Sequence, residues 1–196
     1  ENETVYLIME YLNGETLKAR LEREGVLSPR EATRIMTPVL QALEVVHGAE
    51  LLHRNIDPDS IFLCKSGEVK LIHFGTAKYA ALHDIQSLSA LSNPGFSPVE
   101  QYRSEGEQGS WSDVYAAGAT LYKMLTGVTP PSSTERLEKD ELRNPAGVPE
   151  WIWSADRKYR HLKYLLACYL YHTMTGRNPG EAAAEVLEST GYLRDS

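Results

Sequence analysis

The chain has 196 residues, of which 42% are hydrophobic and 24% are charged, and its formal net charge is −7. This length can bury the core of one domain, while the negative and interspersed charge offers no basic surface to nucleic acid or an anionic membrane. No apolar stretch approaches the ~20 residues of a membrane span and no signal peptide is visible, so we expect no membrane contact from this segment. Cys64 and Cys168 each stand alone in an apolar stretch, which favours free thiols in a reducing cytoplasm.

The first predicted elements are a strand and a short helix. The apolar run from Val5 to Leu12 is typical of a buried strand, and Asn13-Gly14 behind it is typical of a turn. Glu15 to Glu24 reads as a short helix that Gly25 closes.

A longer helix follows, with a clear start signal. Ser28 is a good N-cap, Pro29 suits the first helical position and Glu31 completes a capping box. Apolar residues then recur at helical spacing for about 20 residues, until His47-Gly48. Pro38 lies inside this helix, where we expect it to cause a kink.

The middle of the chain predicts a hairpin and a long loop. Ile61 to Cys64 and Val69 to Ile72 are two short strands, and the turn residues between them complete a hairpin signal. Residues 73–109 are rich in Ser, Gly, Asn and Pro, so we expect a long loop with one short helix.

The remaining elements are helices. Ser110 to Thr126 is apolar on most faces, which predicts a buried helix. A short charged helix fits Thr134 to Leu142, and two more fit Tyr159 to Met174 and Gly180 to Ser189. The chain is therefore predicted to be mainly α, with a small β-hairpin, and α+β overall.

Five segments, taken together, resemble the motifs of bacterial Ser/Thr protein kinases. In chain order they are HRNIDPDSIFL (53–63), HFG (73–75), NPGFSPVEQY (93–102), WSDVYAAGATLYKMLTG (111–127) and GRNP (176–179). The resemblance implies a hinge strand and linker at 1–14 and a protein-kinase-like C-terminal lobe at 15–196, with the N-terminal lobe largely absent. Within that lobe, residues 51–63 correspond to the catalytic loop and residues 73–102 to the activation segment.

At four positions the resemblance fails in the residues that phosphoryl transfer uses. The family has a base Asp, a phosphate-contacting Lys, a metal-binding Asn and a metal-binding Asp where this chain has, in that order, Asn55, Asp57, Ser60 and His73. An amide is no base at neutral pH, and losing a general base alone costs about 10²- to 10⁴-fold in rate. Asp57 would repel the transferred phosphate instead of attracting it, and imidazole is a poor ligand for a hard cation. We therefore expect no catalytic residue and no metal.

The residues that shape the family's fold are kept. By resemblance they are the stacked His53 and Phe74, Gly75 beside them, the pair Glu100 and Arg177, Arg54, and Asp113, which is expected to hydrogen-bond the catalytic-loop backbone. Arg54 has two open readings. It could receive a phosphorylated residue, with Ser87, Ser89 and Ser92 as candidates, or it could be held by local carbonyl groups.

Nucleotide binding is expected to be weak or absent, so no cofactor is predicted; ATP and magnesium would belong only to an active kinase. If a nucleotide binds, the resemblance implies backbone contacts from Glu10 and Leu12, a ribose contact from Glu15 and an adenine floor at Phe62. The preferred interpretation of Glu15 is a solvated residue at a helix start. His73, Asp57 and Asp59 could instead form a metal site, although no zinc-like spacing supports one.

The functional prediction is a catalytically inactive pseudokinase lobe in the cytoplasm that acts as a protein-binding scaffold or allosteric regulator in Ser/Thr kinase signalling. Its partner would be an active kinase or its own N-terminal lobe, and a homodimer is left open. The alternatives are a Ser/Thr kinase with a non-standard active site and a gene product without a present role. Aromatic residues near the C-terminus mark either a partner surface or core packing. They are Trp151, Trp153, Tyr159, Tyr164, Tyr169 and Tyr171.

Overall fold

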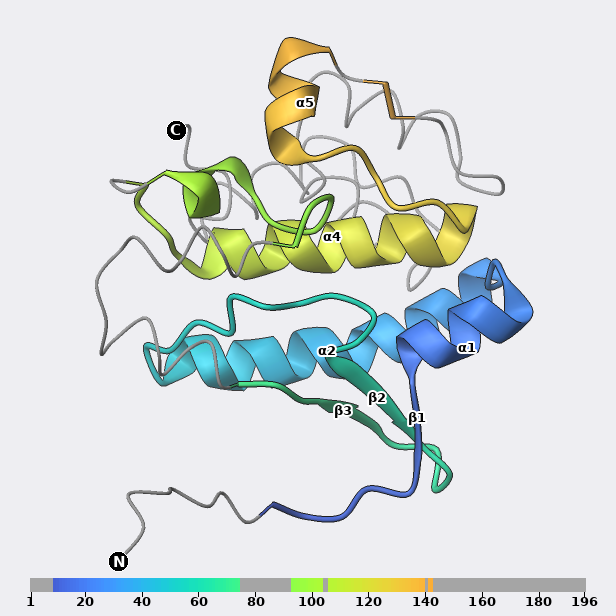
Figure 1. Ribbon diagram of the computed structural model, residues 1–196. Coiled ribbons are helices and arrows are strands. Elements are labelled where there is room, and N and C mark those ends of the chain that lie inside the picture. Colours follow the sequence, from blue (N-terminus) through green and yellow to red (C-terminus); the bar gives the residue numbers. More distant parts are fainter. Residues whose placement is uncertain (1–8, 75–92, 104–105, 140, 143–196) are drawn as a thin grey trace, which may run out of the picture.

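The computed structural model describes residues 9–74, 93–103, 106–139 and 141–142. Its elements are strand β1 (Gly14–Thr16), helices α1 (Leu17–Glu24) and α2 (Pro29–Gly48), strands β2 (Ile61–Cys64) and β3 (Val69–Leu71), the 3-10 helix η3 (Val99–Tyr102), and helices α4 (Ser110–Thr126) and α5 (Ser133–Glu138) (Figure 1). The helices predicted at 159–174 and 180–189 lie outside the described residues, as does most of the predicted long loop.

The first strand begins later than the sequence predicted. Residues 9–13 are in no strand, and β1 starts at Gly14, where a turn was expected. Gly14 lies opposite Cys64 in an antiparallel pairing with β2. A Cβ atom at Gly14 would lie only 2.0 Å from the carbonyl oxygen of Leu63, so the missing side chain is what allows this close approach.

Helix α1 begins two residues later than predicted. The side-chain oxygen of Thr16 accepts a hydrogen bond from the backbone N–H of Ala19, with 3.2 Å between the two atoms. This N-cap fixes the helix start at Leu17. Glu15, which the sequence placed in the helix, is therefore a residue of β1.

Helix α2 has the predicted bounds and the predicted cap. Ser28 and Glu31 form both halves of a capping box, with Pro29 at the first helical position. The helix continues through Pro38 to Gly48.

The predicted hairpin is confirmed and belongs to a three-stranded antiparallel sheet in the order β1-β2-β3. Ile61 pairs with Leu71, and Leu63 pairs with Val69. Strand β3 ends at Leu71, one residue before the predicted end.

The two described helices of the second half differ in how well they match the prediction. Helix α4 has the predicted bounds, is buried along almost its whole length and ends at Gly127, which adopts a left-handed conformation with φ 73°. Helix α5 is capped by Ser132 and stops at Glu138, short of the predicted Leu142.

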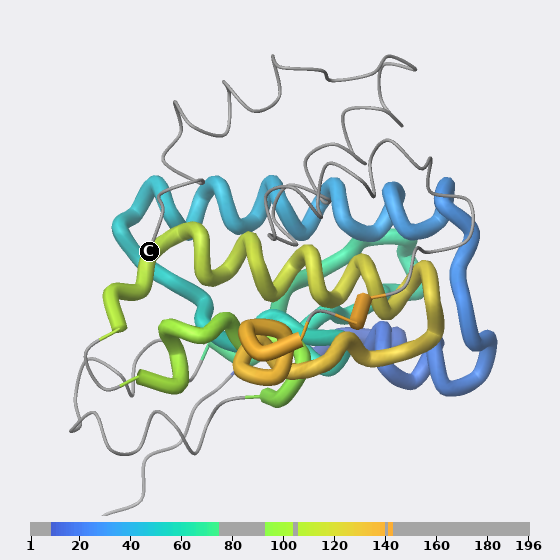
Figure 2. Tube along the Cα trace, turned by 90° about the horizontal axis from the view of Figure 1, so that it is seen from above, coloured from blue at the N-terminus to red at the C-terminus, as the bar shows by residue number. Residues whose placement is uncertain are grey.

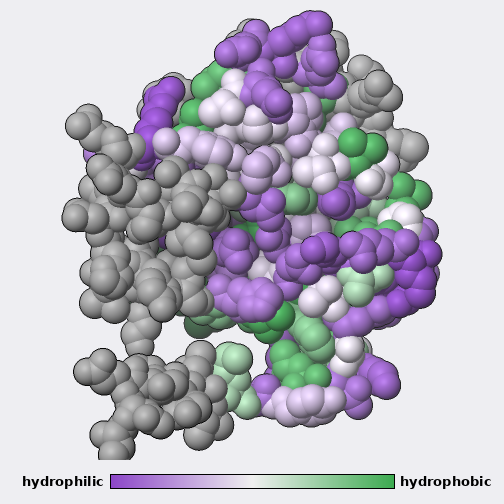
Figure 3. Space-filling view, in the orientation of Figure 1, coloured by the Kyte–Doolittle hydropathy of each residue, from purple (hydrophilic) through white to green (hydrophobic). Residues whose placement is uncertain are grey.

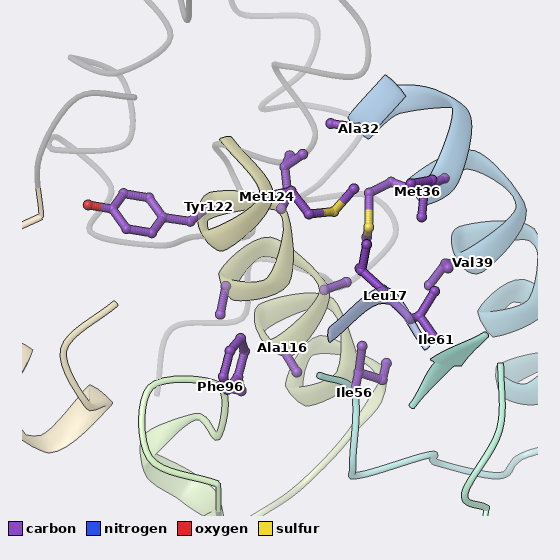
Figure 4. Packing of buried hydrophobic residues seen from close by; sticks show 14 of the residues in the cluster. Leu17, Ala32, Met36, Val39, Ile56, Ile61, Phe96, Ala116, Tyr122 and Met124 are labelled. Atoms are coloured by element: carbon purple, nitrogen blue, oxygen red, sulfur yellow. The ribbon is translucent and has the colours of Figure 1, made fainter. Parts of the chain in front are cut away.

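The core lies between α2, α4 and the sheet. Helices α2 and α4 run side by side in opposite directions, and the sheet covers the other side of α2 (Figures 1 and 2). The side chains of Leu17, Met36, Val39, Ile61 and Met124 point toward one another from four different elements (Figure 4). Fully burying such a side chain contributes about 1.5–3 kcal/mol. Ile56, in the segment between α2 and β2, is buried in the same core.

The outer surface is mostly polar. In the face that Figure 3 shows, hydrophilic residues cover most of the described surface and hydrophobic residues form small separate groups. Among the described helices, none has the length and apolarity that crossing a membrane requires.

Candidate functional site

The segment 53–60, which resembles a catalytic loop, is anchored by the buried carboxylate of Asp113 in α4. Oδ2 of Asp113 accepts hydrogen bonds from the backbone N–H of His53 (2.8 Å) and from Nε2 of His47 (2.8 Å). Oδ1 accepts from the backbone N–H of Arg54 at 2.7 Å. Asp113 is only 1% exposed, so these three donors replace the water that the charge has lost. The carboxylate therefore joins α2, the loop and α4.

His53 is fully buried and connects the loop to the end of β3. Its Nε2 lies 2.9 Å from the carbonyl oxygen of Ile72, which can only accept, so Nε2 carries the proton. Its Nδ1 accepts from the backbone N–H of Asn55 at 3.3 Å. Burial lowers the pKa of His53, and the nearby Asp113 carboxylate opposes that shift only in part. The ring also meets Phe74 edge-on, with 4.5 Å between the centroids.

Two residues of the site have unusual backbone conformations. Arg54 has φ 63° and His73 has φ 67°. Both values lie in the left-handed region, which residues with a Cβ atom rarely adopt. Such conformations cost on the order of 1–3 kcal/mol each and persist when the surroundings fix them. The backbone hydrogen bond from Arg54 to Asp113 is one such constraint, and the bond from the Ile72 N–H to the Ser60 carbonyl (2.8 Å) is another.

The buried carboxylate of Asp57 stabilises the loop by accepting hydrogen bonds from within it. Its Oδ1 accepts from the backbone N–H groups of Asp59 and Ser60, both at 2.8 Å. Its Oδ2 accepts from Nδ2 of Asn93 at 2.6 Å. The side chain is 6% exposed. The sequence predicted a charge that repels phosphate, whereas the structure gives Asp57 a structural role in the loop.

A local signal for this role was present in the sequence. An Asp followed two and three residues later by backbone N–H groups in a turn is a common Asx arrangement, and the run Asp57-Pro58-Asp59-Ser60 fits it. The partner Asn93 could not be found in the same way, because it lies 36 residues further along the chain.

Asp59, the other carboxylate of the loop, also has a partner. Its Oδ2 lies 2.7 Å from Nζ of Lys18 in α1. The backbone N–H of Lys18 donates to the carbonyl oxygen of Pro58 at 2.9 Å. Helix α1 is therefore attached to the loop at two adjacent points.

The donor set at the expected metal positions does not fit magnesium. The Ser60 hydroxyl is fully buried and donates to the backbone oxygen of Asp57 at 2.9 Å. His73 is exposed and offers a nitrogen, whereas magnesium prefers oxygen ligands. Across the described ranges, no three metal-ligating side chains gather in one place, so the reading of His73, Asp57 and Asp59 as a metal site gains no support.

The predicted nucleotide contacts are spread along β1 and the segment before it. Glu10 is exposed and pairs with Lys70 at 2.7 Å, and Leu12 is half-buried. Glu15 forms a salt bridge with Arg23, which lowers the pKa of its carboxyl group.

Phe62 lies opposite Thr16 of β1 and Lys70 of β3 and is half-buried. Because side chains alternate along a strand, Phe62 faces away from the side that buries Ile61.

The remaining predicted residues are described only in part. The carbonyl oxygen of Arg54 accepts a hydrogen bond from Nε2 of Gln101 at 3.3 Å. The side-chain Nε of Arg54 is buried and meets no acceptor among the described residues. Glu100 accepts from the Ser112 hydroxyl at 2.8 Å. Several predicted residues lie outside the described ranges: Gly75, Arg177, the three candidate serines (Ser87, Ser89 and Ser92) and the C-terminal aromatic residues. Both readings of Arg54 therefore stay predictions.

A loop anchored by a buried carboxylate, followed by a hairpin, is the arrangement that the sequence motifs implied. A family model described as "Protein kinase domain" matches residues 1–165. The chain belongs to the protein kinase family. Among curated relatives of this kinase-family chain is the serine/threonine-protein kinase PknL of Mycobacterium tuberculosis, 32% identical over 183 residues, which are 93% of this chain and 44% of the relative. A probable serine/threonine-protein kinase PknB of Bifidobacterium longum is 38% identical over 130 residues, covering 64% of this chain and 18% of the relative.

Solved structures agree with this family. The structure titled "PpkA-294 apo form" matches with a TM-score of 0.61 and 29% identity, over 82% of this chain and 61% of that one. The kinase domain of Mycobacterium tuberculosis PknI matches with a TM-score of 0.51 and 21% identity, over 70% of this chain and 48% of that one, and so supports the fold alone. The kinase-family chain therefore has a protein-kinase-like fold, and it spans less than half the length of the curated relatives named above.

Proposed function

We propose that this member of the protein kinase family is a catalytically inactive pseudokinase lobe that works as a protein-binding scaffold or allosteric regulator in Ser/Thr kinase signalling. One observation carries the proposal. Asn55 stands where the family has its base, and the buried one of the two nearby carboxylates, Asp57, is already engaged. Asp57 is buried under three hydrogen bonds, and Asp59 is paired with Lys18. A general base needs a free lone pair within hydrogen-bond reach of its substrate.

The metal positions support the same conclusion. Phosphoryl transfer needs oxygen ligands that hold magnesium on the phosphates. The Ser60 hydroxyl points into its own loop, and His73 supplies an imidazole. We accordingly propose that no ATP or magnesium cofactor serves this chain.

The preserved frame favours a binding role over loss of function. The carboxylate of Asp113 and the ring of His53 hold the loop in the family's arrangement. A lobe that keeps this frame can fold and present a fixed surface. We propose an active kinase, or the chain's own N-terminal lobe, as the partner, in the cytoplasm; association of two copies is the other arrangement to test.

A Ser/Thr kinase with a non-standard active site is the alternative. It is favoured by the curated relatives, which are named as serine/threonine-protein kinases. For it to hold, a base outside the described part of the chain would have to reach the position beside Asn55.

The test is transfer of labelled γ-phosphate from ATP by the longest natural version of the protein, to itself and to a mixture of Ser- and Thr-containing peptides. We expect no magnesium-dependent transfer. A parallel variant restores Asn55→Asp, Ser60→Asn and His73→Asp while keeping Asp57, and a second adds Asp57→Lys. Transfer by the unaltered protein would overturn the proposal, whereas transfer only by a restored variant would support it.

A further inference from the structure

A pocket of about 390 Å³ is lined by residues of β1, the β2–β3 hairpin and helices α1 and α2. Its wall contains no residue of the 53–60 loop and neither His73 nor Asp113, and of the predicted site residues it includes only Glu15. Its volume falls within the ~300–1,000 Å³ that ligand sites usually have.

The floor of the pocket is apolar and firm. Ile35 of α2 is buried in the core, and Leu63 and Val69 of the hairpin pack against that core from the edge. Because close-packed cores resist deformation, this floor keeps its shape without a ligand.

Several charged side chains on the wall already have partners. Glu15 is paired with Arg23, and Arg20 donates to Glu24 (3.0 Å) and Glu31 (2.9 Å). These contacts neutralise charge within the wall itself.

Two cations on the wall are left over. Arg34 and Lys65 are exposed, and neither side chain has an ion pair or hydrogen bond within the ranges that the structure describes. Glu68 of the wall is also exposed and has no ion pair in the described ranges, so two uncommitted cations stand against one uncommitted carboxylate. In a chain whose net charge is −7, this excess of positive charge beside an apolar floor favours a ligand with an apolar and an anionic group.

We propose that this pocket binds a peptide segment of a partner protein in which an aliphatic side chain lies beside one or two carboxylates. The aliphatic group contacts Ile35, Leu63 and Val69, and the carboxylates pair with Arg34 and Lys65. A peptide fits better than a small amphiphile because the rim residues are exposed, which allows a backbone to continue beyond the pocket. This inference rests on the proposed function, because the pocket would be the surface through which the proposed scaffold binds its partner.

The test measures the fluorescence anisotropy of labelled decapeptides with the longest natural version of the protein. Three matched sets are compared: Leu flanked by Asp and Glu, Leu flanked by Lys, and Ser flanked by Asp and Glu. We expect only the first set to bind, and added salt to weaken it. Equal binding of the Lys set, or no binding by any set, would overturn the proposal.

Reversing the charge of the two wall cations tests whether the peptide binds in this pocket. Arg34→Glu and Lys65→Glu together should weaken the first set by about tenfold or more. The matched control is Arg30→Glu, which reverses an exposed cation of α2 outside the pocket wall and should leave binding unchanged. Equal losses in both variants, or displacement of the peptide by decanoate, would contradict the proposal.

The two proposals fail separately. If the chain transfers phosphate but the peptide binds as described, the inactive lobe is wrong and the pocket stands. If no phosphate is transferred and the peptides do not bind, the pocket is wrong and the inactive lobe stands.

Discussion

Asp113 and Asp57 are both buried aspartates, and each accepts three hydrogen bonds, but they hold different things together. Asp113 joins α4 to the backbone of the loop and to His47 of α2. Asp57 joins the loop to itself and to Asn93. By resemblance to the family's motifs, Asp113 matches the carboxylate expected at its position, whereas Asp57 stands where a Lys is expected.

The two aspartates therefore show that the loop can keep its backbone arrangement while its residues for chemistry differ. The hydrogen bonds that Asp113 accepts from the backbone N–H groups of His53 and Arg54 depend on the path of the loop backbone, and these bonds are present. The resemblance implies a cation at position 57 for phosphoryl transfer, whereas the chain has a carboxylate that accepts hydrogen bonds within the loop and from Asn93. We propose that a residue that contacts phosphate in an active kinase is replaced here by one that contacts protein.

The largest predicted effect concerns the frame. Asp113→Ala leaves one buried and one part-buried backbone N–H group and the His47 ring without their acceptor, so we expect a loss of about 3–5 kcal/mol in the free energy of unfolding. Urea denaturation measures it. Asp113→Asn, which keeps one acceptor oxygen, should lose less. A loss below about 1 kcal/mol for the Ala variant would show that the frame does not depend on this carboxylate.

The next effect concerns the loop. Asp57→Ala should cost about 1–3 kcal/mol, because two backbone N–H groups and the Asn93 amide lose their acceptor. Asp57→Lys, although it restores the family's residue, should destabilise at least as much.

A double-mutant cycle isolates the link between the loop and residue 93. Asp57→Ala and Asn93→Ala should show a coupling of roughly 0.5–3 kcal/mol by urea denaturation. Additive losses would mean that the 2.6 Å contact does not stabilise the protein.

A further prediction concerns pH. Burial lowers the pKa of His53 from its usual value of 6.5, so the unfolded chain takes up a proton that the folded chain resists. Stability is therefore full above that value and falls as the pH drops below it, until the lowered pKa of the folded state is reached. Urea midpoints at about pH 7.5 and about pH 5.5 should differ in this direction.

The matched control for the pH effect is His53→Gln, which has an amide that can still donate toward the Ile72 carbonyl but does not titrate. Its urea midpoint should change less across the same range. Carboxyl groups with lowered pKa values, such as those of Glu15 and Glu31, lose their contribution only at lower pH, below about 4.5. An unchanged pH response in the His53→Gln variant would assign the effect to another group.

The smallest effect concerns the surface. Lys18→Ala removes the ion pair with Asp59, but both side chains are about half exposed, with relative exposures of 50% and 46%. Exposed pairs contribute little and are screened by salt. We expect a shift in the urea midpoint close to experimental error that vanishes at high salt. A loss as large as that of Asp57→Ala would mean that α1 anchors the loop.

The sequence predicted the local parts of this fold well, for a physical reason. The capping box of Ser28 and Glu31 marks the start of α2, and the apolar spacing that follows it marks the rest of the helix. The apolar run of 110–126 marks α4 in the same way. The signals for these helices lie inside the helices themselves.

Long-range contacts could not be predicted in that way. Strand β1 was placed too early because Gly14 pairs with Cys64, 50 positions away, and nothing near Gly14 signals that partner. The same is true of Asn93 and Asp57. The contact of Asp113 with the loop was expected only because the motifs resemble a family, not because of any local pattern.

The most direct test of the inactive lobe is a thermal-shift titration of the longest natural version of the protein with ATP, with and without magnesium. A ligand at ~100 times its dissociation constant adds about 2.7 kcal/mol of stability, which moves the unfolding midpoint visibly. We predict no magnesium-dependent shift, because the Ser60 hydroxyl is used within its loop and His73 is a poor magnesium ligand. A clear shift with ATP that requires magnesium would contradict this account and favour a working kinase.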